Sequence, residues 1–241
     1  MKILAREVIE QGQITVRSDL KLQPFIIRVL GINDLMAVLQ LQSNVMAAMD
    51  KKELYVPIPE HELQFILEGH GESLGLFIHD ELYAACSLLF DVDYENNMAR
   101  ELDFSDEELS LVAQLELSLV HLDLRGNKLQ HKLAGILAER AEERKKSRYI
   151  FTTASPFNYP SIQTLTSLGL YIARLSKMYY DWDRYIVYKD FTKPTRLDLT
   201  SSITLPNTSF VEQQHLLNNG YRGYSQFRDK DGIKIMFAKT I

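Results

Sequence analysis

The sequence contains a single cysteine, Cys86, among its 241 residues. An internal disulfide needs two cysteines, so no disulfide framework is available to the chain. Cys86 lies in an apolar run, which favours a packed and reduced thiol. We therefore expect a reducing compartment, and a cytoplasmic location agrees best with this composition.

Long apolar stretches are also absent. No segment approaches the roughly 18 apolar residues that a membrane-spanning helix needs. Charged residues interrupt the first seven positions before the core of a signal peptide can form. Neither membrane insertion nor export is expected.

An excess of positive charge is missing as well, because the net charge is −5. The field of the whole molecule then repels polyanions, and a nucleic-acid partner is disfavoured. Four basic residues near the C-terminus stand among aromatic ones, but Asp229 and Asp231 interrupt them. We interpret these lysines and arginines as protection of a strand edge.

Catalytic motifs with a known mechanism are absent too. The sequence has no P-loop, no nucleophile elbow and no H-E-x-x-H motif, and its six histidines lack the spacing of metal ligands. No metal is therefore expected. We find no internal repeat and no low-complexity tract, while 46% hydrophobic and 24% charged residues predict an ordinary folded domain.

Hydrophobic periodicity and turn residues predict a mixed α/β (α+β) fold. Strands are expected at 14–17, 25–30, 73–79, 82–90, 112–121, 148–154, 171–178 and 185–188, followed by a hairpin at 223–239. Helices are expected at 35–46, 60–68, 127–146, 160–168 and 210–217. The polar segment 95–108 and the segment 191–195 are interpreted as a solvated loop and a linker.

The strand at 112–121 alternates between apolar and polar residues. Leu115, Leu117 and Leu119 share one face, which we expect in the core. The other face carries Gln114 and Glu116, among others, and is expected to look into polar surroundings.

The start of the following helix carries an unusual charge pattern. Arg125, Lys128, His131 and Lys132 lie near its N-terminus, where the helix dipole is positive and acidic neighbours are preferred. A bound phosphate or pyrophosphate would make this cluster favourable, with Gly126 allowing close approach. The alternative is an exposed helix whose charges lie there by chance.

The segment 120–130 resembles the acyl-CoA-binding fingerprint of the GNAT superfamily of N-acyltransferases, Q/R-x-x-G-x-G/A after a strand. Arg125 matches its first position, whereas Lys128 and Gln130 stand where the pattern has small residues. Lys128 is compatible with the pattern if its backbone is already helical. A second stretch resembles N-x-x-A/S and then a helix ending in L-G-F, and its matching residues are Asn158, Ser161, Leu168, Gly169 and Leu170.

The resemblance covers residues 23–192 and implies a GNAT-like, mostly antiparallel splayed sheet flanked by helices. The order β-α-α-β-β-β-α-β-α-β-β, read from the periodicity, is also the order of that family. Residues 1–22 would then form an N-terminal strand or extension, and residues 193–241 a small C-terminal α+β extension made of a helix and a hairpin.

The resemblance also implies acetyl-CoA or another acyl-CoA as the cofactor. The pyrophosphate would lie at residues Arg125, Gly126, Asn127, Lys128, Leu129 and Gln130. Pantetheine would follow the strand at Leu119 and Val120, with Asn158 and Ser161 on its far side; capping of a helix is the alternative role for Asn158. In many members a tyrosine protonates the departing thiolate, and Leu165 stands at its position here. The possible substitutes, which the sequence does not rank, are Tyr159, Tyr171, Tyr179 and Tyr180.

A general base must deprotonate the amine before it attacks the thioester. Glu116 is the first candidate, with His121 and Glu101 as rivals. We thus expect an N-acetyltransferase acting on a small-molecule or peptide amine, or alternatively a non-catalytic acyl-CoA-binding or protein-interaction module. The acceptor depends on the loops at 45–60 and 91–110, and the oligomeric state is not readable from the sequence.

Overall fold

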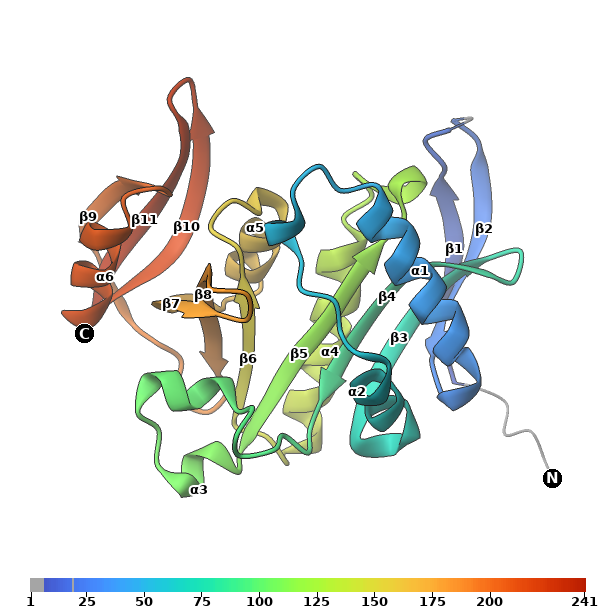
Figure 1. Cartoon of the computed structure of the whole chain (residues 1–241), viewed down its shortest axis with the longest axis horizontal. Coiled ribbons are helices and arrows are strands. Elements are labelled where there is room, and N and C mark those ends of the chain that lie inside the picture. Colours follow the sequence, from blue (N-terminus) through green and yellow to red (C-terminus); the bar gives the residue numbers. More distant parts are fainter. Residues whose placement is uncertain (1–6, 19) are drawn as a thin grey trace. The chain divides into compact units, whose positions relative to one another are not determined.

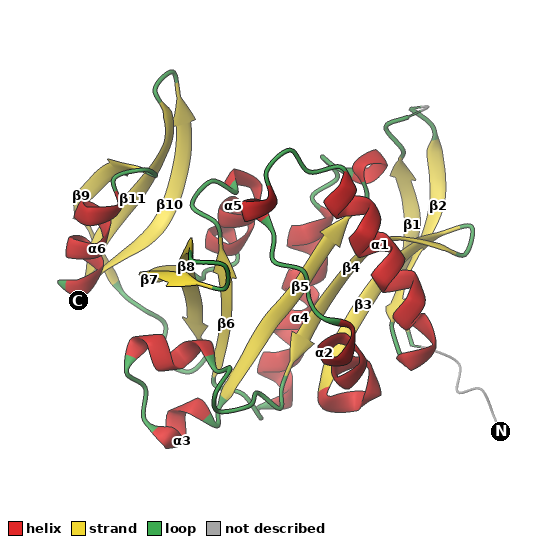
Figure 2. Cartoon of the chain, viewed as in Figure 1, coloured by secondary structure: helices red, strands yellow, loops and turns green. Residues whose placement is uncertain are grey.

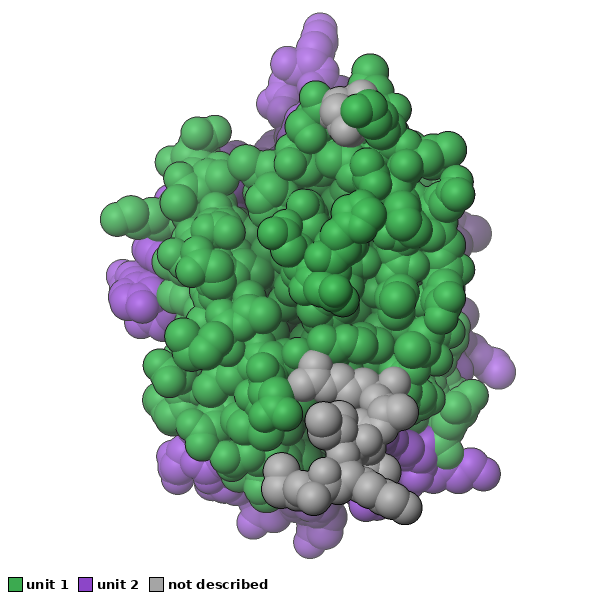
Figure 3. All heavy atoms as spheres, turned by 90° about the vertical axis from the view of Figure 1, so that its right-hand side faces the viewer, with its two compact units in different colours: residues 1–52, 57–91, 115–143 green, residues 53–56, 92–114, 144–241 purple. Residues whose placement is uncertain are grey.

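The computed structural model describes residues 7–18 and 20–241. The chain divides into two compact units, coloured in Figure 3. Unit 1 comprises residues 1–52, 57–91 and 115–143, and unit 2 comprises residues 53–56, 92–114 and 144–241. Among the described residues, no helix is long and apolar enough to cross a membrane.

Unit 1 is a sheet covered by helices on both faces. Its elements are β1 (Val8–Thr15), β2 (Leu22–Val29), α1 (Leu35–Ala47), α2 (Glu60–Phe65), the π-helical turn η3 (Ile66–His70), β3 (Gly71–Ile78), β4 (Glu81–Leu89), the later part of β5 (Val112–Val120), η5 (Leu122–Leu124) and α4 (Leu129–Arg144). Strands β1, β2, β3 and β4 pair in this order and antiparallel. In Figure 2, α1 lies in front of these strands and α4 behind them.

The helices of unit 1 form where apolar residues recur every three or four positions. In α1 the buried residues include Val38, Leu41 and Val45, and in α4 they include Leu133 and Leu137. Each helix therefore presents one apolar stripe to the sheet. The strands β3 and β4 are buried along most of their length, because helices cover both faces.

Unit 2 is built on a second run of strands. Its elements are η2 (Lys52–Leu54), η4 (Met98–Leu102), α3 (Asp106–Leu109), the first part of β5, β6 (Tyr149–Ala154), α5 (Tyr159–Ser167), β7 (Tyr171–Met178), β8 (Trp182–Asp190), β9 (Leu197–Pro206), α6 (Phe210–Asn218), β10 (Tyr221–Asp229) and β11 (Gly232–Thr240). The strand order is β5-β6-β8-β7-β10-β11-β9 (Figure 1).

The pairing of these strands confirms the predicted sheet type. Strand β5 pairs with β6 in parallel over Val112–Gln114 and Tyr149–Phe151, and the remaining neighbours in unit 2 are antiparallel. The predicted order of helices and strands between residues 23 and 192 is also confirmed, from β2 and α1 to β7 and β8, except that the short helix α3 lies between β4 and β5.

The segment 95–108 is not the continuous loop that its polarity predicted. It contains η4 and α3. Ser105 and Glu108 form a capping box around the start of α3, and the Asn97 side chain accepts a hydrogen bond from the N–H of Ala99. The S-x-x-E pattern at Ser105 was a usable signal for this helix start.

Two other expectations were wrong. Residues 197–206 form the strand β9, which the sequence analysis did not predict, and its residues 199–202 are exposed. Gln114 does not look into polar surroundings, because it is 2% exposed and its Oε1 accepts a hydrogen bond from the N–H of Met98 at 2.6 Å.

The structure also contains a repeat that the sequence does not reveal. The first repeat consists of β6, α5, β7 and β8, and the second repeat consists of β9, α6, β10 and β11. In each repeat the strands pair in the order first, third, second, with antiparallel neighbours. Both helices have nine residues, and each is followed by a left-handed glycine, Gly169 (φ +80°) or Gly220 (φ +82°).

The two repeats meet through equivalent residues. Ile172 of β7 pairs with Gly223 of β10, and each lies at the start of the bulge in its own hairpin. The Asn207 side chain donates to the Pro156 carbonyl at 2.9 Å, which joins the two strand-to-helix connections. Contacts between corresponding positions are typical of a two-fold relation. We therefore describe the two repeats as related by an approximate two-fold axis near Ile172 and Gly223.

Candidate functional site

The first group of predicted site residues lies in unit 1, where β5 leads through η5 into α4. His121 ends the strand, and its backbone N–H donates to the Tyr83 carbonyl at 2.8 Å. Its ring packs edge-on against Tyr83, and its Nδ1 accepts a hydrogen bond from the N–H of Asp123. A neutral His121 in this arrangement carries its proton on Nε2.

The loop before α4 has two residues with left-handed backbone. Gly126 has φ +92° and is exposed, and a Cβ atom there would meet nothing within 4 Å. Lys128 has φ +56°, so its backbone is not helical, contrary to the condition stated above. The helix begins at Leu129 and not near Asn127. Lys128 thus holds, at the fingerprint's glycine position, a conformation that glycine adopts without steric cost.

The positive charges of this loop differ in their surroundings. Lys132 contacts Glu10 of β1 at 2.6 Å, so one member of the cluster already has a carboxylate partner from a distant strand. Arg125 is half-buried and Lys128 is exposed. The Asn127 side chain donates to the carbonyls of Thr15 and Leu124, which ties the loop to β1.

The strand residues of the group are buried to different degrees. Leu119 is 1% exposed and belongs to the core, whereas Glu116 and Val120 are half-buried. On the same strand, Ser118 lies beside Cys86 of β4, and burial raises the pKa of the Cys86 thiol to about 12. Cys86 is therefore a packed thiol, as predicted, and not a nucleophile at neutral pH.

The second group lies in unit 2. Asn158 caps α5, because its Oδ1 accepts from the N–H of Ser161 at 3.2 Å and its Nδ2 donates to the Leu54 carbonyl at 3.1 Å. Capping, the alternative role for Asn158, is thus the one that the geometry displays. Glu101 accepts a hydrogen bond from the Ser176 hydroxyl at 2.9 Å.

Leu165 stands where the related pattern has a tyrosine, and it is 2% exposed. It packs on the buried side of α5 together with Ile162. The residue therefore contributes to the core and supplies no proton.

Arg184 of β8 is a polar residue that the sequence analysis missed. It is 4% exposed, its Nη1 donates to the Glu53 carbonyl at 3.2 Å, and its Nη2 donates to the Thr153 hydroxyl at 3.3 Å and to the Thr153 carbonyl at 3.4 Å. Burial lowers the pKa of Arg184 to about 10. No signal in the sequence marks it, because a single arginine in a strand is read as an exposed position.

Metal ligands do not gather anywhere in residues 7–18 and 20–241: no three His, Cys, Asp or Glu side chains lie close enough together to hold an ion.

Comparisons with known proteins give similarity in structure only. No family model matches the sequence, and no curated protein matches it. Among solved structures, the chain is similar to Arabidopsis thaliana NAA60 in complex with acetyl-CoA (13% identity, TM-score 0.57, 70% of this chain and 99% of that chain).

Two bacterial structures show the same similarity. One is a putative acetyltransferase from Salmonella typhimurium with its cofactor acetyl-CoA (15% identity, TM-score 0.54, 73% of this chain and 98% of that chain). The other is an acetyltransferase of the GNAT family from Streptococcus pneumoniae (15% identity, TM-score 0.53, 69% of this chain and 98% of that chain). The predicted GNAT fold is confirmed, and it spans nearly the whole length of these structures.

Proposed function

We propose that this chain, which has the GNAT fold, is an acyl-CoA-dependent N-acyltransferase that transfers an acetyl or other acyl group to an amine. The observation that carries the proposal is the likeness to acetyltransferases over 98% or more of their own chains, two of them solved with acetyl-CoA. Fold alone does not fix an activity, so the proposal also depends on the residues around α4.

In this proposal the loop from Arg125 to Gln130 would hold the pyrophosphate of coenzyme A. Gly126 leaves open space beside its backbone, and Lys128 has the left-handed conformation that the fingerprint's glycine favours. Arg125 and Lys128 would supply positive charge, and the start of α4 would add its dipole. Lys132 would contribute less than the sequence suggested, because Glu10 offsets its charge.

The remaining roles follow from position on β5. The backbone of Leu119 and Val120 would hold pantetheine, since the Leu119 side chain itself belongs to the core. Acetyl-CoA supplies the activated thioester. Glu116 is our first candidate for the base that takes the proton of the amine, and His121 and Glu101 remain rivals. An amine freed of its proton would attack the thioester directly.

Isothermal titration with acetyl-CoA and with free coenzyme A tests the cofactor site. We expect both to bind, and we expect the Arg125→Glu, Lys128→Glu double variant to lose at least ten-fold in affinity, about 1.4 kcal/mol. Lys145→Glu, just beyond the end of α4, makes the same kind of charge change and should leave affinity unchanged. Equal affinity in the wild type and the double variant would contradict the pyrophosphate assignment.

Turnover tests the catalytic assignment. We expect Glu116→Gln to lower kcat at least a hundred-fold on an identified amine, the size of a typical general-base contribution. His121→Gln should then retain most of the activity. The opposite ranking of these two variants would transfer the role of the base to His121.

A second function deserves a test because of Leu165. Its place in the core removes the proton donor found at this position in many relatives, which is what a non-catalytic acyl-CoA-binding module would display. Release of the thiol from acetyl-CoA in the presence of an amine library separates the two functions. Binding without thiol release for every amine would favour the module.

A further inference from the structure

The guanidinium of Arg184 is a buried charge without a carboxylate partner. Among the residues that the structure describes, no carboxylate lies within ion-pair distance of it, and its Nε has no hydrogen-bond partner. The arginines 28, 140 and 148 have side chains that are 18%, 26% and 34% exposed, and each of them contacts a carboxylate. Arg184 is more deeply buried than these three arginines, and it lacks the carboxylate partner that each of them has.

Buried charges in proteins are paired or hydrogen-bonded, because an isolated one is costly. The lowered pKa of Arg184 has the same cause, which is burial. An anionic ligand removes this cost by supplying the missing negative charge. The Nη1 and Nη2 groups of Arg184 are hydrogen-bonded to the protein, but its charge has no carboxylate and its Nε–H has no acceptor among the described residues. A bound anion would supply both.

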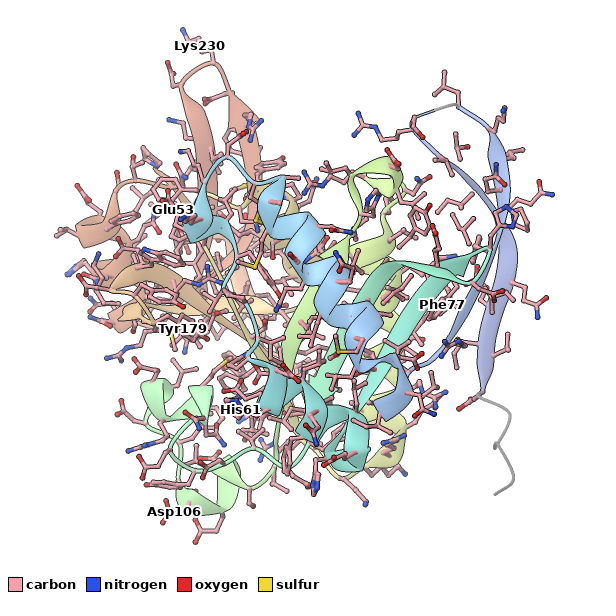
Figure 4. The ribbon with its side chains drawn as sticks, turned by 45° about the vertical axis from the view of Figure 1, so that its right-hand side comes forward. Glu53, His61, Phe77, Asp106, Tyr179 and Lys230 are labelled. Carbon is pink, nitrogen blue, oxygen red and sulfur yellow. The ribbon has the colours of Figure 1, made fainter. Side chains whose placement is uncertain are left out.

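Two hydroxyl groups lie close to Arg184. The Thr153 hydroxyl accepts a hydrogen bond from its Nη2 at 3.3 Å, and the Tyr179 hydroxyl lies 3.5 Å from the Thr153 hydroxyl. The Tyr179 ring lies over the guanidinium, with its centroid 5.9 Å from the central carbon. Tyr179 is 49% exposed, so the side chain that lies over the guanidinium itself reaches solvent. Figure 4 labels Glu53 and Tyr179, two of the residues that contact Arg184.

The charge and shape of this site select the kind of anion. The guanidinium of Arg184 carries one positive charge and planar donors, which match a carboxylate, and its Nε–H is the donor that the protein leaves unused. A phosphate monoester carries about two negative charges and calls for more than one cation. Arg184 supplies one positive charge, and Thr153 and Tyr179 supply hydroxyl groups.

Arg184 contacts the loop from which we expect selection of the acceptor. It binds the Glu53 carbonyl, and Asn158, a predicted cofactor contact, binds the carbonyl of the next residue, Leu54. Both carbonyls belong to the loop at 45–60, from which we expect acceptor selection. Arg184 and Asn158 thus hold the same short turn η2.

We propose that Arg184, Thr153 and Tyr179 bind a carboxylate, and that the acceptor is an amine bearing this carboxylate, such as a free amino acid or an acidic peptide. The second part rests on the proposed acyl transfer, whereas the first part does not. Arg184 is in this proposal a specificity-determining residue and takes no part in the chemistry.

The test uses matched acceptors with acetyl-CoA: the common L-amino acids, their carboxamides, and O-phosphoethanolamine. We expect the wild type to favour one or more acids over the matching amides by at least ten-fold in kcat/KM. Arg184→Met should abolish this ratio mainly through KM, and Arg184→Lys should restore part of it. Arg148→Lys, at an arginine that pairs with Asp190, is the control and should keep the ratio.

Binding of N-acetyl amino acids and of their amides, measured by saturation-transfer NMR without coenzyme A, gives a readout that does not need turnover. We expect the acids to bind the wild type and not Arg184→Met; Tyr179→Phe and Thr153→Val should bind them more weakly while keeping the fold, checked by circular dichroism. No preference for acids, a preference for O-phosphoethanolamine, or no binding of any acid overturns the carboxylate site. Failure of acetyl-CoA to bind, with acids still bound, overturns only the proposed transferase.

Discussion

The two repeats of unit 2 share a topology but differ in how far their surfaces are covered. In the first repeat, β6 lies between β5 and β8, whereas in the second repeat its counterpart β9 has β11 on one side and ends the strand order. Arg184 of β8 is 4% exposed, and Lys234, in the corresponding place of β11, is half-buried. The short helical turns η2 and η4 pack against the first repeat, and the second repeat has no equivalent of either turn among its described residues.

This difference shows that two repeats can share the same strand topology while the polar side chains on them have different surroundings. The inward positions agree in both repeats, since Tyr185 and Val187 of β8 correspond to the buried Ile235 and Phe237 of β11. Packing between the helices and the sheet therefore fixes the common frame. The segment 53–56, which unit 2 draws from an earlier part of the chain, supplies the Glu53 carbonyl that contacts the buried Arg184 of the first repeat.

The pair at the two-fold axis should give the largest effect. A Cβ atom on Gly223 would lie 2.9 Å from the Cβ of Ile172, so Gly223→Ile should lower the free energy of unfolding by about 3 kcal/mol. If the two positions are equivalent, the swap with Ile172→Gly restores space and recovers at least half of this loss. Urea unfolding of both single variants and the double variant measures the coupling. Additive losses would contradict direct packing of the two repeats at this pair.

Asp190, at the end of β8, comes next. Burial raises its pKa, but hydrogen bonds from Arg148, Lys193 and Thr192 outweigh burial, and the net pKa is below the ordinary value. Asp190→Asn should cost about 2 kcal/mol at pH 7, because it breaks the ion pair with Arg148.

The pH dependence of this loss has a definite sign. A carboxylate with a lowered pKa in the folded state stabilises the protein above its unfolded pKa of about 3.9, and this contribution disappears as the pH falls through the folded pKa. The difference between wild type and Asp190→Asn should therefore shrink below about pH 4 in urea titrations. Thr240→Val, at the corresponding end of β11, serves as the control and should show a smaller loss that does not vary with pH.

A smaller effect is expected where one repeat hydrogen-bonds to the other. The Tyr185 hydroxyl donates to Oε1 of Gln213 in α6 at 2.6 Å, and both residues are buried. Tyr185→Phe should cost about 1 kcal/mol because it leaves the Gln213 oxygen without this bond. Tyr224→Phe removes a hydroxyl beside Ser202 near the surface and should cost less in thermal unfolding. Equal losses would show that the bond to α6 adds nothing.

The smallest difference in stability is expected between the residues that precede α5 and α6, Asn158 and Ser209. Asn158 makes two hydrogen bonds at the start of α5, whereas Ser209 at the start of α6 makes no side-chain capping bond. We expect Asn158→Ala to cost about 1 kcal/mol and Ser209→Ala only a few tenths of that, by thermal unfolding. A larger loss for Ser209→Ala would reverse the ranking of the two caps.

Much of the fold could be predicted from the sequence because its signals are local. The stripe of leucines in α4, the hairpin of β3 and β4, and the glycines that end α5 and α6 are each readable within a short window. Strand β9 was missed because its middle is polar and exposed, so it lacks both alternation and an apolar run. The repeat was not predicted because its two copies share the order in which their strands pair and do not share the residue types at corresponding positions.

The site was less predictable, because its chemistry depends on long-range contacts. The Glu10 carboxylate contacts Lys132 from a strand more than a hundred residues earlier, and the backbone carbonyl of Glu53 contacts Arg184 over a similar separation. The left-handed backbone of Lys128 likewise cannot be predicted from its residue type, because lysine rarely adopts this conformation. Sequence patterns locate the loop before α4 and place the helix start to within two residues. Only the structure tells which of the positive charges there already has a carboxylate partner.

The pairing of β7 with β10 has a consequence for assembly. A strand edge that a second molecule might have occupied is filled by a segment of the same polypeptide, at an effective concentration set by the short intervening chain. Dilution therefore does not open this seam, and its contribution to thermal stability should be the same at nanomolar and millimolar protein.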